Sequence, residues 1–324
     1  MITLALAALV AAVVLAIVAR YPAIAPRDLP NERSLHAAPV PRAGGWAVWA
    51  GWFAVAPLLP APPGFAPSSY LVFVVALAAL FAVSLVDDFR GVPAAWRMTV
   101  QVACAIAVAV ALVPAIPTDV LLVGAIAFVL VAATNFFNFM DGSDGLAGAM
   151  TVVGFTTLAL GAATDRTASF LPLLALAVAA LPFLVRNLPP ARVFLGDAGA
   201  APLGFFAAAA GIAGTLAGTW PAWFPVLAFL PFIADATVTL MRRVLRRERV
   251  WEPHRSHYYQ RLVRLGAGHP GTLAVYAAMM LGCGGTALAC LAWQPSAGPL
   301  ALAGWTAAVA LLFAGIDYHW RLRA

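Results

Sequence analysis

The sequence contains no lysine, and only 10% of its 324 residues carry a formal charge. Soluble globular domains carry about 25% charged residues, so an ordinary soluble domain is excluded. A hydrophobic content of 63% and a mean hydropathy of +0.92 instead indicate an integral membrane protein. Because every basic residue is arginine, any phosphate group must be bound by guanidinium groups rather than by a lysine ammonium.

Cysteine is scarce as well, and Cys104, Cys283 and Cys290 all lie in apolar runs. No pair has the spacing of a zinc site or a redox motif, so we expect three apolar packing residues. The net charge of +6 does not indicate nucleic acid as a partner, because the arginines sit in short loops between apolar runs. Membrane topology places arginines in such loops.

Most of the chain consists of apolar runs close to the length of about 20 residues that a helix needs to cross a bilayer. We count eleven runs, or ten if the stretch 198–241 is divided wrongly near Thr219. The predicted spans are 2–19, 44–62, 69–86, 96–114, 118–134, 145–163, 168–185, 198–217, 220–241, 270–292 and 298–316. We therefore predict an all-α integral membrane protein in which residues 1–324 form a single polytopic domain.

The arginines orient these spans. None precedes the first run, whereas Arg20, Arg27, Arg33 and Arg42 follow it, which puts the N-terminus outside by the positive-inside rule. Eleven spans then put the C-terminus in the cytoplasm, with 18 of the 19 arginines, all except Arg166, on the cytoplasmic side. The predicted cytoplasmic loops lie near 20–43, 86–96, 135–145, 186–198 and 242–269.

The second of these loops reads VDDFRG and contains the adjacent carboxylates Asp87 and Asp88. Two neighbouring carboxylates repel each other unless a cation or a shared proton relieves them. Mg²⁺ prefers one or two carboxylates together with substrate phosphates, so the pair is a candidate for metal binding or general-base chemistry. The alternative is a solvated helix end that pairs with Arg90.

The third loop reads NFFNFMDGSDGLAG and spaces Asn135, Asn138, Asp141 and Asp144 three residues apart. On a continuous helix this spacing would put the four side chains roughly on one face. The glycines that follow each aspartate make a break in the helix equally consistent with the sequence. Amides and carboxylates together can recognise a polar ligand, and a capped turn is the structural alternative.

The fourth loop contains FLGDAG, in which Asp197 stands just before an apolar run. A helix N-terminus among small residues binds phosphate well, although an aspartate there also serves as an N-cap. Phe194, three residues earlier, is positioned to stack on a base.

Two loops are basic rather than acidic. The first contains PRAGG, in which Arg42 either pairs with a phosphate or anchors the topology. The fifth contains HRSHYYQRL, with His254, Arg255 and His257, and is also suited to lie on anionic lipid. The role of Asp235, in the preceding span, stays open between packing and substrate contact.

The ordered set PRAGG, VDDFRG, NFFNFMDGSDGLAG, FLGDAG and HRSHYYQRL resembles the polyprenyl-phosphate N-acetylhexosamine-1-phosphate transferases of glycosyltransferase family 4. The resemblance implies an MraY-like fold in the bacterial plasma (inner) membrane. It also implies transfer of a HexNAc-1-phosphate from a UDP-N-acetylamino sugar to undecaprenyl phosphate, with release of UMP. Mg²⁺ is the implied cofactor, with Mn²⁺ as a substitute.

Carried over motif by motif, the resemblance implies three groups of site residues. The implied catalytic residues are Asp87, Asp88 and Asp144. The implied metal ligands are Asp197 and Asp88. The implied substrate-binding residues are Asn138, Asp141, Phe194, Arg42, His254, Arg255 and His257.

Two departures from MraY-type members narrow the expected role. This chain has two rather than three consecutive acidic residues in VDDF, and its histidines are separated rather than adjacent. The sequence therefore most resembles the WbpL-type subgroup that initiates O-antigen chains for the lipopolysaccharide. A WecA-like enzyme specific for UDP-GlcNAc and a peptidoglycan MraY-like enzyme are the alternatives within the family, and a transporter or lipid flippase is the alternative outside it. The sequence leaves a homodimer open.

Overall fold

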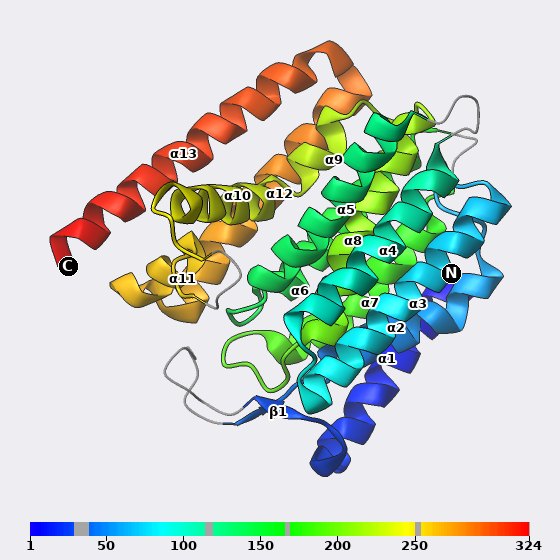
Figure 1. Ribbon diagram of the computed structural model, residues 1–324, viewed down its shortest axis with the longest axis horizontal. Helices are drawn as coiled ribbons and strands as arrows, with labels where there is room; N and C mark the ends of the chain where they lie inside the picture. Colours follow the sequence, from blue (N-terminus) through cyan, green and yellow to red (C-terminus); the bar gives the residue numbers. More distant parts are fainter. Residues whose placement is uncertain (29–38, 114–118, 166–168, 250–253, 324) are drawn as a thin grey trace.

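The computed structural model describes residues 1–28, 39–113, 119–165, 169–249 and 254–323. Figure 1 shows a bundle of long helices whose connecting loops gather at two opposite ends, with a short two-stranded sheet at one of them. The helices of the bundle are α1 (Ile2–Arg20), α2 (Gly44–Val55), α3 (Pro67–Arg90), α4 (Ala94–Leu112), α5 (Val120–Phe139), α6 (Leu146–Ala162), α7 (Leu171–Asn187) and α8 (Asp197–Leu216).

The C-terminal part adds a second group of helices beside this bundle. They are α9 (Trp223–Ala228), α10 (Leu230–Leu245), α11 (Tyr258–Leu262), α12 (Gly268–Trp293) and α13 (Gly298–Arg323), with a π-helical turn over Val263–Ala267. Short 3₁₀ turns cover Pro22–Ile24, Ala56–Leu58 and Pro295–Ala297. The sheet pairs β1 (Arg27–Asp28) antiparallel with β2 (Val40–Pro41).

Helix α8 is the centre of the bundle. Most of its residues are buried, and it packs against α5, α3 and α2. Its sequence is rich in alanine and glycine, and small residues let helix backbones approach closely inside a membrane. At Gly204 the approach is so close that a Cβ atom would overlap the carbonyl group of Ala133 on α5.

The all-α polytopic architecture predicted from the sequence is confirmed, whereas the number of spans is not. Seven helices in the described ranges are long and apolar enough to cross a membrane, and α6 and α7 are apolar but shorter. The predicted span 220–241 is not one continuous helix, because the chain forms α9 and α10 with a break at Phe229. Pro231, in the first turn of α10, has no N–H with which to continue a helix through this point.

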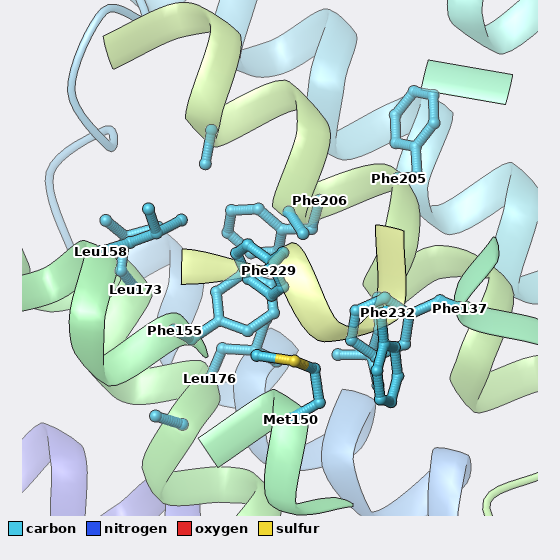
Figure 2. Close-up of a cluster of buried hydrophobic side chains, with 14 of the residues drawn as sticks. Phe137, Met150, Phe155, Leu158, Leu173, Leu176, Phe205, Phe206, Phe229 and Phe232 are labelled. Carbon is cyan, nitrogen blue, oxygen red and sulfur yellow. The ribbon is translucent and has the colours of Figure 1, made fainter. Parts of the chain in front are cut away.

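An aromatic cluster holds this break against the core. Figure 2 shows Phe229 beside Phe155 and Phe206, and Phe232 beside Phe137. The ring centroids of Phe155 and Phe229 are 5.8 Å apart, and those of Phe137 and Phe232 are 5.1 Å apart, both in edge-to-face arrangements. Such pairs add stability beyond the burial of their area. The cluster therefore fixes the start of α10 relative to α5, α6 and α8.

The contact at Gly204 leads to a stability prediction. Gly204→Ala should lower the thermal unfolding temperature of the purified protein, because overpacking costs roughly 1–3 kcal/mol. Gly124→Ala on α5 is the matched control, since its Cβ would meet nothing within 4 Å. Thermal unfolding of both variants in one detergent checks this, and equal unfolding temperatures for the two would contradict the close α5–α8 contact.

Candidate active site

The PRAGG and FLGDAG motifs are joined by backbone hydrogen bonds. The N–H of Phe194 donates to the carbonyl of Pro41 at 2.9 Å, and the N–H of Gly44 donates back to the carbonyl of Phe194 at 2.9 Å. Arg42 and Phe194 thus lie side by side in a parallel bridge. A Cβ at Gly45 would overlap the backbone of Gly199 on α8, so the glycine pair of PRAGG permits this close approach.

Asp88 joins the VDDFRG motif to the same loop. Its side chain is fully buried and accepts hydrogen bonds from the N–H groups of Asp197 at 3.1 Å and Ala198 at 3.0 Å. These are among the free N–H groups of the first turn of α8, so Asp88 caps that helix from α3. Gly196 has φ +76°, and a Cβ there would lie 2.8 Å from Asp88 Oδ2.

Asp87 and Asp197 share one guanidinium group. Nη1 of Arg97 forms an ion pair with Asp87 and lies 3.0 Å from Asp197 Oδ2. The second carboxylate oxygen of Asp87 accepts the N–H of Val92 at 2.5 Å. The side chain of Asp197 remains 30% exposed, so this carboxylate is the one of the three that is most open to a ligand.

Asp141 adds a fourth carboxylate to this corner. It lies after the end of α5 and accepts a hydrogen bond from the backbone N–H of Gly196. Burial raises the pKa of its carboxyl well above the usual range, and the negative charges of Asp197 and Asp88 raise it further. Asp141 therefore belongs to the same electrostatic cluster.

The two asparagines of the third motif differ in their surroundings. Helix α5 ends at Phe139, so Asn135 and Asn138 lie on a helix and the two aspartates lie in the turn that follows. Of the two alternatives for the third motif, the break in the helix is confirmed and the continuous helix is not. Asn135 is committed to packing, since its amide donates to Gln101 on α4 at 2.8 Å. Asn138 is half-buried, one turn before Asp141.

Asp144 points away from the other carboxylates. Its Oδ2 accepts the N–H of Ala191 at 2.9 Å, and its Oδ1 lies 3.5 Å from Nδ1 of His269. The side-chain amide of Asn187 also connects the two loops: it accepts the N–H of Gly145 and donates to the carbonyl of Val193. These contacts fasten the third loop to the fourth, which is a positioning role in the described structure.

The histidine motif is organised by Asp235. This fully buried carboxylate lies on α10 and accepts hydrogen bonds from the N–H groups of Tyr258 at 2.9 Å and Tyr259 at 3.0 Å, at the start of α11. It also lies 3.1 Å from Nδ1 of His257 and accepts the hydroxyl of Tyr276 at 2.5 Å. Asp235 therefore fixes both the short helix and the histidine before it.

The segment around His257 reaches the turn after α5. The hydroxyl of Tyr259 donates to the carbonyl of Phe139 at 3.0 Å, and the ring of His257 lies 5.9 Å from that of Phe139. His254 stacks on His257 at 4.9 Å, and burial, with the charges of His257 and Arg243, lowers its pKa to about 4. His254 is thus neutral near pH 7. Arg255 is half-buried between the two histidines.

The structure therefore brings most of the predicted residues together in two neighbouring groups at one end of the bundle, the lower left in Figure 1, whereas Asp144 belongs to neither group. We define the carboxylate corner as Asp87, Asp88, Asp141 and Asp197 with Arg42 and Arg97. We define the histidine arm as residues 254–262. Segment 29–38, which contains Arg33 of the first predicted loop, lies outside the described residues.

The corner tests the expectation of a divalent cation. Four carboxylates face two guanidinium groups, one of which, that of Arg42, also pairs with Asp28 at 2.5 Å. At least two negative charges are therefore in surplus if all are ionised. In the described part of the chain, no three His, Cys, Asp or Glu side chains are close enough to hold a metal by themselves. Both facts fit Mg²⁺, which takes one or two protein carboxylates and completes its shell with water and substrate phosphates.

Three residues of the site had no clear role in the sequence. Arg97 is a single arginine near the start of an apolar run, and its pairing with Asp197 spans 100 residues. His269 stands in the ordinary-looking sequence GHPG. The sequence leaves Asp235 open between packing and substrate contact, and its five hydrogen-bonding neighbours assign it to positioning.

The chain is similar to one protein family and to several known enzymes. A family model described as Glycosyl transferase family 4 matches residues 70–215, from α3 to α8. A probable undecaprenyl-phosphate N-acetylglucosaminyl 1-phosphate transferase of Bacillus subtilis is 28% identical over 257 residues, covering 75% of this chain and 71% of its own length. A decaprenyl-phosphate N-acetylglucosaminephosphotransferase of Mycobacterium leprae is 29% identical, with 74% and 70% covered.

Similarity to a third kind of enzyme is confined to a short stretch. A phospho-N-acetylmuramoyl-pentapeptide-transferase of Trichormus variabilis is 48% identical over 79 residues, which is 24% of this chain and 21% of that protein. The family model spans three of the five motifs, namely VDDFRG, NFFNFMDGSDGLAG and FLGDAG. These matches support the family that the motifs indicate, the polyprenyl-phosphate N-acetylhexosamine-1-phosphate transferases of glycosyl transferase family 4.

Proposed function

We propose that this protein transfers a HexNAc-1-phosphate from a UDP-N-acetylamino sugar to undecaprenyl phosphate at the cytoplasmic face of the bacterial inner membrane. An oxygen of the lipid phosphate attacks the phosphorus that carries the sugar. A new P–O bond forms, the P–O bond to the other phosphate breaks, and UMP leaves with the electron pair. The observation that carries the proposal is the junction of Arg42, Phe194 and Asp197 with Asp87 and Asp88.

The carboxylate corner supports the acceptor side of this reaction. A phosphate monoester is largely ionised at neutral pH, so its attack needs positioning and charge neutralisation more than a strong base. Arg42 is 36% exposed; its Nη2 pairs with Asp28 at 2.5 Å, and its Nη1 lies 3.9 Å from Asp88. The Nη1 side of the guanidinium is therefore the one that can meet a phosphate. Asp87, held by Arg97 and the Val92 N–H, orients the lipid phosphate or accepts its proton.

Mg²⁺, with Mn²⁺ as a substitute, would be held mainly by Asp197. Both oxygens of Asp88 already accept N–H groups of α8. Asp88 would therefore contribute to metal binding mainly as a neighbouring negative charge. When bound, the cation neutralises phosphate charge that the arginines leave uncompensated. The guanidinium of Arg97 lies on the same Asp197 oxygen, so it contributes positive charge beside the metal position.

Three residues support binding of the uridine nucleotide of the donor: Phe194, Asn138 and Asp141. Phe194 offers an aromatic ring for the uracil next to Arg42, and aromatic stacking on a base is worth about 1–3 kcal/mol. Asn138 can both donate and accept hydrogen bonds. Asp144 supports the site by tying the third loop to the fourth rather than by reaching the substrate.

The histidine arm supports binding of the donor diphosphate and sugar. His257 is oriented by Asp235 and lies against Phe139, next to the Asn138–Asp141 turn. The named relatives act in N-acetylglucosamine phosphate transfer, which makes UDP-GlcNAc the first donor to test. We further propose that the separated histidines direct the chain toward O-antigen initiation, with UDP-FucNAc or UDP-QuiNAc as the other donors.

A transporter or flippase is the competing function, and Asp235 is the carboxylate that would favour it. Its two oxygens are engaged by donors from Thr239, His257, Tyr258, Tyr259 and Tyr276. A carboxylate with five fixed donors is suited to positioning rather than to passing ions, so this observation favours the transferase.

The transferase leads to a direct prediction for Asp197→Asn. Purified protein with Mg²⁺, undecaprenyl phosphate and UDP-GlcNAc, UDP-FucNAc or UDP-QuiNAc should release UMP. Asp197→Asn should lower kcat at least about 100-fold, because one preorganised electrostatic contact to the transferring group is lost. Asp119→Asn is the matched control: Asp119 caps α5, and asparagine caps helices equally well.

Two results would contradict this prediction. Retained activity of Asp197→Asn would remove that residue from the metal and phosphate chemistry. Absence of turnover with every donor in folded wild-type protein would overturn the transferase itself, and substrate uptake into proteoliposomes without UMP release would favour transport.

A second prediction concerns the Asp235–His257 pair. Asp235→Asn should lower kcat/KM at least about tenfold per folded protein, because an aspartate that orients an imidazole is not replaced by its amide. Thr239→Val is the matched control, since it removes one hydrogen bond to Asp235 and none to His257. His257→Gln and the double variant should have equal activity, and additive losses would contradict action through His257.

A further inference from the structure

A separate cavity of about 350 Å³ lies between α10, α11 and α13. Four arginines contribute to its wall, together with Asp317 and Trp320; they are Arg242, Arg246, Arg261 and Arg321. None of these residues belongs to the carboxylate corner, whose aspartates come from α3, α8 and the turn after α5. Figure 1 shows α13 on the opposite side of α10 and α12 from α3 and α4.

The cavity has a surplus of positive charge. Asp317 lies 2.6 Å from Nη1 of Arg242 and 2.7 Å from Nη1 of Arg261. Four guanidinium groups against this one carboxylate leave a charge of about +3 within the wall, and the exposed side chains of Arg246 and Arg321 border the opening. Guanidinium groups bind phosphate oxygens in a bidentate manner, so the cavity is suited to a phosphate group.

Exposed apolar side chains lie on the same two helices as this charged cavity, and one of them, Leu245, lines it. On α10, Val244 is 60% and Leu245 77% exposed, and on α13, Tyr318 is 62% and Leu322 67% exposed. The ring of Trp320 lies under the guanidinium of Arg264, with 4.8 Å from Cζ to the ring centroid. Arginines, an amphipathic tryptophan and exposed aliphatic side chains together are typical of the boundary between lipid tails and headgroups.

We propose that this cavity is a binding site for the headgroup phosphate of an anionic phospholipid. It is separate from the position of the acceptor phosphate at the carboxylate corner. The four arginines bind the phosphate, and the exposed side chains of α10 and α13 contact the acyl chains. A zwitterionic lipid is disfavoured, because its ammonium group would enter a wall that is already positive.

The site also contacts the histidine arm. Tyr258 and Arg261 lie on α11, and the hydroxyl of Tyr258 donates to Asp317 at 3.1 Å. The guanidinium groups of Arg242 and Arg261 lie 5.3 and 5.2 Å from the centroid of the Tyr258 ring. An anion bound here would therefore fix the far side of α11, whose first residue follows His257.

The test measures lipid binding and does not depend on transferase activity. Full-length protein is delipidated in a neutral detergent and mixed with micelles containing phosphatidylglycerol or phosphatidylcholine, and bound lipid is counted by native mass spectrometry. We expect selective retention of phosphatidylglycerol. Arg246→Gln/Arg321→Gln should weaken it by about fivefold for each arginine removed, as expected for arginines near an anionic lipid surface.

Arg20→Gln/Arg27→Gln is the matched control, because both side chains are exposed and lie outside the cavity. If wild type and the Arg246/Arg321 variant retain equal amounts of phosphatidylglycerol, the site is overturned. It is also overturned if the Arg20/Arg27 control loses as much phosphatidylglycerol as the Arg246/Arg321 variant. Displacement of phosphatidylglycerol by excess inorganic phosphate would assign the cavity to free phosphate and overturn the lipid assignment. Failure of displacement, with loss confined to the Arg246/Arg321 variant, supports it.

Discussion

The buried carboxylate of Asp88 at the N-terminus of α8 is the contact on which the carboxylate corner depends. A charged group without water must be compensated by hydrogen bonds, and here the compensation comes from two N–H groups and the positive end of the helix. The same contact joins α3 to α8 across 109 residues of sequence. It fixes where Asp197 lies relative to Asp87, and therefore where two separate motifs form one site.

The carboxylate corner and the histidine arm are held in different ways. The corner lies within the tightly packed bundle, where glycines allow the 40–45 segment to approach α8. The arm depends on Asp235, whose helix starts at the Phe229 break and is fixed by the aromatic cluster in Figure 2. The packing of Phe229 and Phe232 therefore acts on the arm, through α10, more directly than on the corner.

Much of the site could be predicted from the sequence, because each motif contains residues that are costly at a membrane edge. The apolar runs predicted the helices, and the motifs predicted which loops meet. The sequence could not reveal that Asp88 caps a helix 109 residues away, since a cap supplied from another helix leaves no local pattern. For the same reason the orientation of Asp144 toward Ala191 and the role of Arg97 became visible only in the structure.

The break at Phe229 shows a different limit of sequence analysis. An apolar run of 22 residues over 220–241 satisfies the length of a membrane span, and hydropathy alone does not distinguish one helix from two. The aromatic packing around Phe229 and the proline at 231 decide the outcome. The number of spans, unlike the identity of the site, therefore depends on tertiary contacts.

The hydrogen bond between Asp235 and His257 also sets the polarity of the imidazole. An ionised carboxylate can only accept, so Nδ1 of His257 must carry the proton that it donates to Asp235. The other ring nitrogen, Nε2, then has a lone pair when the ring is neutral, and it can accept a hydrogen bond but not give one. A neutral His257 can therefore recognise a hydrogen-bond donor of the sugar, such as a hydroxyl or an acetamido N–H, beside the diphosphate of the same substrate.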